Sequence, residues 1–520
     1  MKELLALISF SFFTAFCSYS QGIQWEKSYG GSGADYANSI IQTLDGCYII
    51  AGGSSSNDGD ITNHIGNYDY WVVKINSLGT IQWQKSFGGS SDDFATSIQQ
   101  TSDGGYIVAG NSNSSDGDVT GNHGNNDYWL VKLDTGGTLQ WEKSFGGSFD
   151  EICSNIRQTQ DKGYVLVGQS YSNDGDVTMH YGVSGDTADI WIVKLDSVGS
   201  IQWQKTYGGT SVDGAGSVIQ TSDGGYIVGG GTTSTFGDFT GNHGNIDCLV
   251  FKLDSVGTIQ WQHEYGGNLD EKMGSVLIKT NDGGYIFPGL TNSNDGDVSG
   301  NHGGIGSDGW VVKIDSLGAI VWQKCLGGTS IDGLGTIQQT IERGYILAGF
   351  TVSNDGDVSG HHGAHNDYWT VKIDSAGSIQ WQKCLGGSMT DYGAHILQST
   401  DLGYIVAGYS DSNDGDVTGN HLDYDYWVVK LSPSLGVNEN YFQNKISIYP
   451  NPNSGKFILY SNKNLSNIKV FDIMGRVIWQ TGVTQSNTFN IDIMNYAKGV
   501  YYVRSVNEDG EIEMQKLIKE

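Results

Sequence analysis

The chain has 520 residues, of which 77 are Gly and four are Pro; 16% are charged, 11% are aromatic, and the formal net charge is −29. So many aromatic residues with so few charged ones exclude a disordered chain. Residues 446–520 hold eight Lys/Arg and seven Asp/Glu, so nearly all the negative charge belongs to residues 1–445. A body of this charge excludes nucleic acid and anionic membranes as partners.

Residues 1–20 predict a secretory signal peptide. Lys2 precedes an apolar run over residues 4–16, and small residues precede a cleavage site ahead of Gln21. Cys17 leaves a lipoprotein signal open, but a bulky Phe stands before it, which disfavours lipidation. The run is too short for a spanning helix, and no other segment has the apolar length for one. A secreted chain without a transmembrane helix is therefore expected after processing.

A unit of about 60 residues then recurs seven times over residues 22–433. Each unit contains four strand-like runs, which in the second unit are Phe94–Thr101, Gly105–Asn111, Asp127–Leu133 and Thr138–Phe145. Gly-rich turns join these runs, and no helical periodicity competes. The units begin at Ile23, Ile81, Leu139, Ile201, Ile259, Ile320 and Ile379. Four antiparallel strands in a unit of this length are typical of a propeller blade.

The phase of the repeat predicts how the ring closes. The order of the runs resembles that of kelch and WD repeats, in which the Ile-Gln-Trp run is the outermost strand of the preceding blade. The chain begins with such a run, Ile23–Tyr29, and its last repeat ends at Asp425–Leu431 without one. We therefore expect the first strand to complete the last blade of a seven-bladed β-propeller, which leaves no unpaired end blades.

Tryptophan recurs with the repeat. Each Ile-Gln-Trp run carries one, and six of the seven third strands carry another. An aromatic ligand platform and packing between blades are both consistent with this pattern. Recurrence in every blade favours packing, because a ligand site needs to be present only once.

A carboxylate follows the Gly-Gly of every repeat, just before the innermost strand. We expect these carboxylates to ring one mouth of the central channel as a candidate cation site, which comprises Asp35, Asp93, Glu151, Asp213, Glu271, Asp332 and Asp391. The loop between the second and third strands opens on the same face and carries paired aspartates in a Gly-bearing segment. Such oxygens could bind Ca²⁺, most clearly at Asp295, Asp297, Asp355, Asp357, Asp414 and Asp416. The alternative is a turn whose carboxylates accept backbone N–H bonds.

Other polar residues also recur, and recurrence favours structural roles for them. Each loop carries a His, and each third strand opens with Asp and carries a Lys. The sixth repeat has extra histidines at His361, His362 and His365, which are the candidate transition-metal ligands. No phosphate loop, Ser-His-Asp order or zinc spacing is present, while carboxylate pairs for glycosidic cleavage stay open.

Composition changes after the repeats. Residues 434–445 form a linker, and residues 446–520 contain Pro450-Asn-Pro-x-x-Gly455, Asp472-x-x-Gly-Arg476 and the ending Lys516-Leu-x-Lys519. This segment resembles the C-terminal sorting domain of the type IX secretion system of Bacteroidota. The resemblance implies an immunoglobulin-like β-sandwich that engages the type IX secretion machinery. It also implies export across the outer membrane, then release or attachment at the cell surface.

Together these observations predict a secreted or cell-surface binding module whose ligand is a glycan, a protein or a cation. The alternatives are a propeller-type polysaccharide-degrading glycosidase or lyase, and a structural surface or matrix component. An active or binding site should break the repeat symmetry. The departures that stand out are residues 179–188, residues 232–239, Pro288 and the sixth-repeat histidines.

Overall fold

The computed structural model describes residues 21–303, 306–433, 447–449, 453–472, 476–481, 486–507 and 512–519. The chain divides into two compact units, Met1–Ser434 and Leu435–Glu520. The predicted signal peptide (1–20) and linker (434–445) lie outside the described residues. In the described part the chain is all-β, and no helix there has the length and apolar character to cross a bilayer.

The first unit repeats one four-stranded antiparallel sheet. In the first repeat β2 (Asp35–Gln42), β3 (Tyr48–Ser54), β4 (Asp69–Ile75) and β5 (Ile81–Phe87) pair in chain order. The next three sheets are β6 (Asp93–Gln100), β7 (Tyr106–Ser112), β8 (Asp127–Leu133) and β9 (Leu139–Phe145); β10 (Glu151–Gln158), β11 (Tyr164–Ser170), β12 (Asp189–Leu195) and β13 (Ile201–Tyr207); β14 (Asp213–Gln220), β15 (Tyr226–Thr232), β16 (Asp247–Leu253) and β17 (Ile259–Tyr265).

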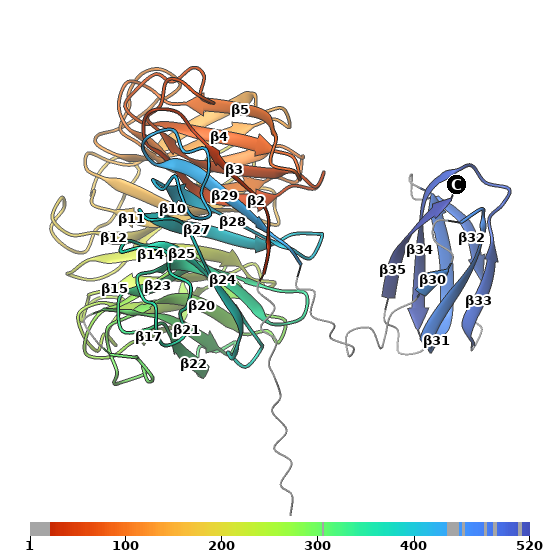
Figure 1. The fold of residues 1–520 in the computed structure, drawn as a ribbon. Coiled ribbons are helices and arrows are strands. Elements are labelled where there is room, and N and C mark those ends of the chain that lie inside the picture. The colour runs from red at the N-terminus through yellow and green to blue at the C-terminus, as the bar shows by residue number, and fades with distance from the viewer. Residues whose placement is uncertain are drawn as a thin grey trace, which may run out of the picture. The chain divides into compact units, whose positions relative to one another are not determined.

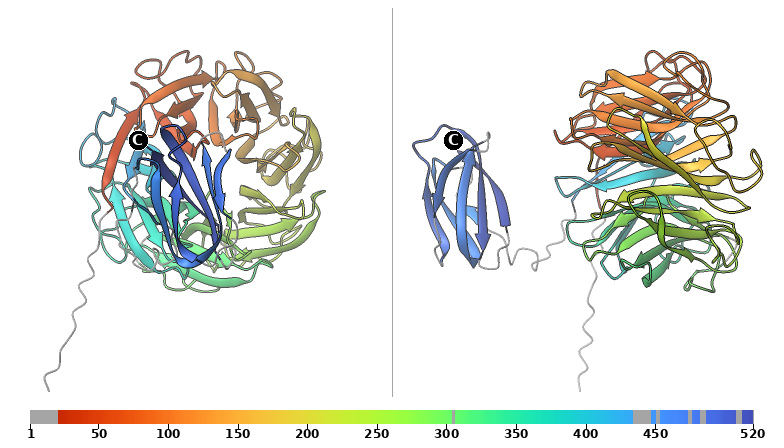
Figure 2. Two further views of the ribbon diagram at one scale, coloured as in Figure 1. Left: turned by 90° about the vertical axis from the view of Figure 1, so that its right-hand side faces the viewer. Right: turned by 180° about the vertical axis from the view of Figure 1, so that it is seen from behind.

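Three further sheets complete the set in the described residues. They are β18 (Glu271–Met273) and β19 (Ile278–Lys279) with β20 (Tyr285–Thr291), β21 (Asp308–Ile314) and β22 (Ile320–Leu326); β23 (Asp332–Gln339), β24 (Tyr345–Thr351), β25 (Asp367–Ile373) and β26 (Ile379–Leu385); β27 (Asp391–Gln398), β28 (Tyr404–Ser410), β29 (Asp425–Leu431) and β1 (Ile23–Tyr29). The sheets lie around a central axis like propeller blades (Figures 1 and 2).

The last sheet is completed by the first strand. β1 pairs antiparallel with β29, from Ile23 opposite Leu431 to Tyr29 opposite Tyr426. The red start of the chain accordingly lies beside the blue end of the repeats (Figure 2). This pairing confirms the predicted closure.

The fifth innermost strand is interrupted, and Pro288 in β20 explains why. Proline has no N–H to donate to a neighbouring strand, so a proline inside a sheet breaks the hydrogen-bond ladder. The opposing segment separates into β18 and β19, and Ser275 between them donates instead to the carbonyl of Gly335 in the next sheet at 2.8 Å.

The core lies between adjacent sheets. The third-strand tryptophans are fully buried, namely Trp71, Trp129, Trp191, Trp310, Trp369 and Trp427. Trp129 packs against Tyr70 of the preceding sheet with ring centroids 4.6 Å apart, and the Tyr70 hydroxyl donates to the Trp129 carbonyl at 2.9 Å. These contacts confirm that the third-strand tryptophans serve packing between blades.

The second unit is built around one long strand. Its strands are β30 (Ser447–Tyr449), β31 (Lys456–Asp472), β32 (Val477–Thr481), β33 (Ser486–Asp492), β34 (Gly499–Asn507) and β35 (Ile512–Lys519). The first half of β31 pairs with β30 and β33, and its second half with β32 and β34. Leu459, Ile468 and Val503 are fully buried in its own core.

Candidate functional site

The seven repeated carboxylates do not line an open channel mouth. Asp35, Asp93, Glu151, Asp213, Glu271, Asp332 and Asp391 are each 0% exposed. Each accepts the N–H of a Gly four residues earlier, as Asp93 does from Gly89 at 2.8 Å. The Ser114 hydroxyl donates to the same oxygen, Asp93 Oδ2, at 2.9 Å. The carboxylates of the expected ring are therefore buried rather than open at the mouth, because local donors hold each one inside its own blade junction, and cation binding by them stays a prediction.

Each of these carboxylates faces a second one, the Asp that opens the third strand of the preceding blade. Around Gly88, the position that a Cβ would take lies 2.6 Å from Asp69 Oδ1 and 2.6 Å from Asp93 Oδ2. Burial, with the Asp69 charge as a minor cause, raises the pKa of Asp93 to about 6. Burial likewise raises the pKa of Asp391 to about 7. Desolvation of the charged form is the main cause, rather than repulsion around a ring.

The paired loop aspartates also have protein partners. The first of each pair accepts a backbone N–H, as Asp295 does from Asn268 (2.9 Å), Asp355 from Thr329 (2.8 Å) and Asp414 from Ser388 (2.7 Å). The second members, Asp297 and Asp357, lie 3.4 Å from the N–H of Gly266 and Gly327, and Asp416 lies 3.8 Å from His362 Nε2. In the described residues no group of three His, Cys, Asp or Glu side chains is placed to share a metal ion. Calcium binding stays a prediction.

Two of the sixth-repeat histidines approach the same carboxylate, since Nε2 of His361 lies 3.9 Å from Asp367 Oδ1 and His362 lies on the Oδ2 side. Nδ1 of His362 lies 2.8 Å from Asp367, and Nε2 of His361 lies 2.7 Å from the carbonyl of His365. Equivalent His–Asp contacts recur in other repeats, for example between His123 and Asp127. The recurring His–Asp pair therefore fixes the loop against the third strand.

A feature that the sequence analysis missed breaks the symmetry. Seven half-buried aromatic side chains form one connected group, here called the aromatic patch: Tyr36, Tyr68, Phe94, Phe350, Tyr392, Tyr409 and Tyr424. Tyr392 stacks between Phe350 (5.1 Å) and Tyr409 (5.3 Å), and Tyr36 meets Tyr409 edge-on at 4.9 Å. Such offset and edge-to-face contacts are the favoured arrangements of aromatic rings.

The patch belongs to four neighbouring repeats, the sixth, seventh, first and second, which closure of the ring brings together. Tyr36 is the second residue of its innermost strand, and that position reads Tyr36, Phe94, Ile152, Gly214, Lys272, Gly333 and Tyr392 around the ring. Across the hairpin the partners of Ile152 and Tyr392 are Gln169 and Tyr409. An aromatic at this position in only three repeats was the available sequence signal.

Carboxylates border the patch. Asp411 Oδ1 accepts the N–H of Thr390 at 2.6 Å, and Asp423 Oδ1 accepts that of Tyr424 at 2.8 Å. A backbone bridge joins Tyr68 to Asp92. Burial first, then these acids and the neighbouring phenols, raise the pKa of Tyr36 and Tyr424. The phenols are therefore neutral at physiological pH, and the surroundings of the patch are anionic.

In the second unit, distant sequence motifs meet. The N–H of Asn453 donates to the carbonyl of Ile518 at 2.9 Å, and Asn453 Oδ1 accepts the N–H of Gly455 at 2.7 Å. Lys519 is 6% exposed, and its ammonium donates to the carbonyls of Ile493 (3.1 Å) and Met494 (2.8 Å). The start and the end of the unit are thus held by one hydrogen-bond network. Pro450, Asn451, Pro452 and Gly475 lie outside the described residues.

Comparison with protein families decides the nature of this unit. Residues 447–520 match the family described as the secretion system C-terminal sorting domain. The second unit is a type IX secretion sorting domain. The chain is therefore exported to the cell surface or beyond the outer membrane, as the motifs predicted, and its sorting domain engages the secretion machinery.

Solved structures resemble the chain only weakly. PorZ, a type IX secretion surface component of Porphyromonas gingivalis, is 11% identical with a TM-score of 0.32 over 91% of this chain and 68% of its own. BBS1N in complex with ARL6DN is 8% identical, with a TM-score of 0.43 over 80% of this chain and 98% of its own. Sqt1 of Chaetomium thermophilum is 10% identical, with a TM-score of 0.36 over 84% and 97%. No curated protein matches the chain.

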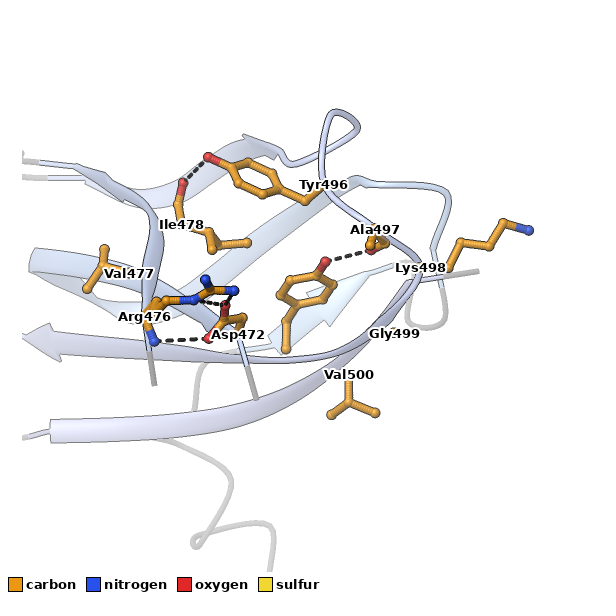
Figure 3. Close-up of a pocket in the computed structure, with 10 residues that line it drawn as sticks. Asp472, Arg476, Val477, Ile478, Tyr496, Ala497, Lys498, Gly499 and Val500 are labelled. Carbon is orange, nitrogen blue, oxygen red and sulfur yellow. Dashed lines mark hydrogen bonds and ion pairs between the residues drawn. The ribbon is translucent and has the colours of Figure 1, made fainter. Parts of the chain in front are cut away.

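The sorting domain has a surface hollow of about 580 Å³ (Figure 3). One wall is the motif pair, in which Arg476 Nε and Nη2 each lie 2.7 Å from Asp472 Oδ2. The opposite wall includes Tyr496, whose hydroxyl donates to the Ile478 carbonyl at 2.6 Å. The Asp-x-x-Gly-Arg motif thus closes its own turn and shapes this hollow.

Proposed function

We propose that this protein is an extracellular binding module. In this proposal residues 1–20 are a cleaved signal peptide, residues 22–433 are a closed seven-bladed β-propeller, residues 434–445 are a linker, and residues 446–520 form an immunoglobulin-like sandwich for export. The propeller binds its ligand at the aromatic patch.

The observation that carries this proposal is the asymmetry of the aromatic patch. The buried carboxylates, the His–Asp pairs and the third-strand lysines recur around the ring, as expected of structural contacts. Among the described residues the patch occurs only on these four adjacent repeats, and its rings are partly exposed. Exposed apolar groups gathered in one place are typical of interaction sites on soluble proteins.

A glycosidase or lyase active site gains less support. The recurring carboxylate pairs are fully buried, as Asp69 and Asp93 show. A sugar ring could reach these carboxylates only if the loop between the second and third strands moved away from them. General acid–base chemistry needs the catalytic group within hydrogen-bond reach of the substrate.

A matched pair of double variants tests the proposal. Tyr392→Ala/Tyr409→Ala removes two patch rings, and Ile152→Ala/Gln169→Ala changes the same two positions in the third repeat. The full chain is titrated calorimetrically with soluble oligosaccharides, peptides and small amines. We expect at least one probe to bind the wild type and the Ile152→Ala/Gln169→Ala variant but not the Tyr392→Ala/Tyr409→Ala variant. Binding that both pairs leave intact, or that both abolish, would place the site elsewhere.

A further inference from the structure

The charge around the aromatic patch selects among ligand classes. Asp92, Asp411 and Asp423 border the rings, and residues 1–445 carry nearly all of the chain's net charge of −29. At the strand position of Tyr36 the seven repeats hold a single basic residue, Lys272, in the fifth repeat and outside the patch. Such a surface repels anionic ligands and attracts cationic ones.

The aromatic rings also attract cationic ligands. The face of a tyrosine ring is the negative end of its quadrupole, so it attracts ammonium and guanidinium groups placed over it. The phenols of Tyr36 and Tyr424 are neutral at physiological pH, as tyrosine ordinarily is, and burial raises their pKa further, so the rings act through their π faces rather than as phenolates. The carboxylates at the border of the patch attract the same cationic groups.

The extent of the patch indicates the size of the ligand. The ring contacts run continuously from Phe350 through Tyr392, Tyr409, Tyr36 and Tyr68. A site for one small cation is typically a cage of a few rings that enclose it. Several partly exposed rings spread over four repeats match an extended ligand with repeated cationic groups better than an enclosed single cation.

We infer that the aromatic patch binds a basic polypeptide segment whose arginine or lysine side chains contact the exposed parts of its rings, an inference that rests on the binding function proposed above. The flanking carboxylates pair with the same cationic groups. Because the chain is exported, the partner is an extracellular or cell-surface protein with such a segment.

The test uses three probes on the full chain, measured by calorimetry at two salt concentrations. The probes are a peptide of alternating Arg and Gly, the same peptide with citrulline in place of arginine, and tetramethylammonium. We expect the arginine peptide to bind more tightly than the other two. Citrulline keeps the shape of arginine and removes its charge, so equal binding of the two peptides would overturn the inference. Tighter binding of tetramethylammonium would instead indicate a small-amine site.

Variants then separate ring stacking from general charge attraction. Tyr392→Ala/Tyr409→Ala should weaken binding of the arginine peptide about tenfold or more, whereas Tyr392→Phe/Tyr409→Phe, which keeps both rings, should stay within about threefold of wild type. Asp411→Asn/Asp423→Asn should weaken binding and reduce its salt dependence. Unchanged affinity of the alanine pair would show that the peptide binds by net charge alone, and would overturn the inference.

The outcomes also separate this inference from the proposed function. If a neutral oligosaccharide binds and loses affinity in the alanine pair, while the arginine peptide does not, the patch is a glycan site: the binding function stands and the basic-ligand inference is wrong. If no probe distinguishes the alanine pair from Ile152→Ala/Gln169→Ala, both fail. The phenylalanine pair preserves packing, so its result holds even if the alanine pair loses stability.

Discussion

At the scale of single residues, every junction between blades contains a glycine with one carboxylate on each side of it. Asp69 and Asp93 are both 0% exposed, and Gly88 lies between them with no room for a side chain. Buried carboxylates that keep hydrogen bonds from backbone and hydroxyl donors can remain inside a protein, but burial disfavours their ionised form. Their main effect is therefore on stability and its dependence on pH.

The pH dependence follows from Asp391, whose pKa burial raises to about 7 from an ordinary value of 3.8. Between these values the folded state binds more protons than the unfolded state, so this residue's contribution to stability falls as pH rises. We expect the melting temperature of wild type to rise relative to Asp391→Asn when pH drops from 8 to 5. Thermal melts of both proteins across this range measure the difference.

The exposed loop residue Asp186 provides the control, because Asp186→Asn also removes one carboxylate but at a site that is not buried. A constant offset between wild type and Asp391→Asn would mean that Asp391 is ionised in the folded protein throughout.

Replacing the glycine tests how tightly the pair is packed. Gly88→Ala would place Cβ 2.6 Å from both carboxylates, while Gly335→Ala meets no atom within 4 Å. We expect Gly88→Ala to cost about 1–3 kcal/mol of unfolding free energy because the two carboxylates must move. Gly335→Ala should have a much smaller effect. Denaturant unfolding measures the free energy of unfolding of both variants. An equal loss in the two would show that the junction is not close-packed.

At the scale of elements, most strands follow from sequence pattern. The third strand of the second repeat was predicted at its observed bounds, and the fourth within a residue, because turn glycines mark where pairing ends. The burial of Asp93 could not be predicted, since it depends on a loop folding back over the Gly-Gly segment. The aromatic patch was missed because Tyr36 and Tyr409 are far apart in sequence and meet only when the ring closes.

Closure itself predicts the effect of losing β1. Beyond its backbone pairing, β1 contributes Glu26, which accepts from the Trp427 indole at 3.0 Å, and Tyr29, which donates to the Gly79 carbonyl at 2.6 Å. A chain that starts at Gly30 exposes an edge of β29 and should melt lower by about 5 °C or more. A chain that starts at Gln21 is the control, and equal melting curves would show that β1 is dispensable.

At the scale of the whole molecule, the sorting domain serves export, and binding is the role that we propose for the first unit. The sorting domain has its own core and its own strand pairing, so the propeller needs no support from it. Truncation after Leu435 should leave a folded propeller that is retained inside the outer membrane. Cell fractionation and protease accessibility measure this, and normal surface exposure of the truncated chain would contradict the role of the sorting domain.

The acidic charge and the aromatic patch support the proposal that the propeller binds its ligand on one side. Hydroxyl-radical footprinting of the full chain with a bound ligand tests this claim most directly. We expect protection of Tyr36, Tyr409 and Tyr424, with no change at Phe236, which is 71% exposed on the fourth-repeat loop. Protection of Phe236 with unchanged oxidation of the three tyrosines would contradict it.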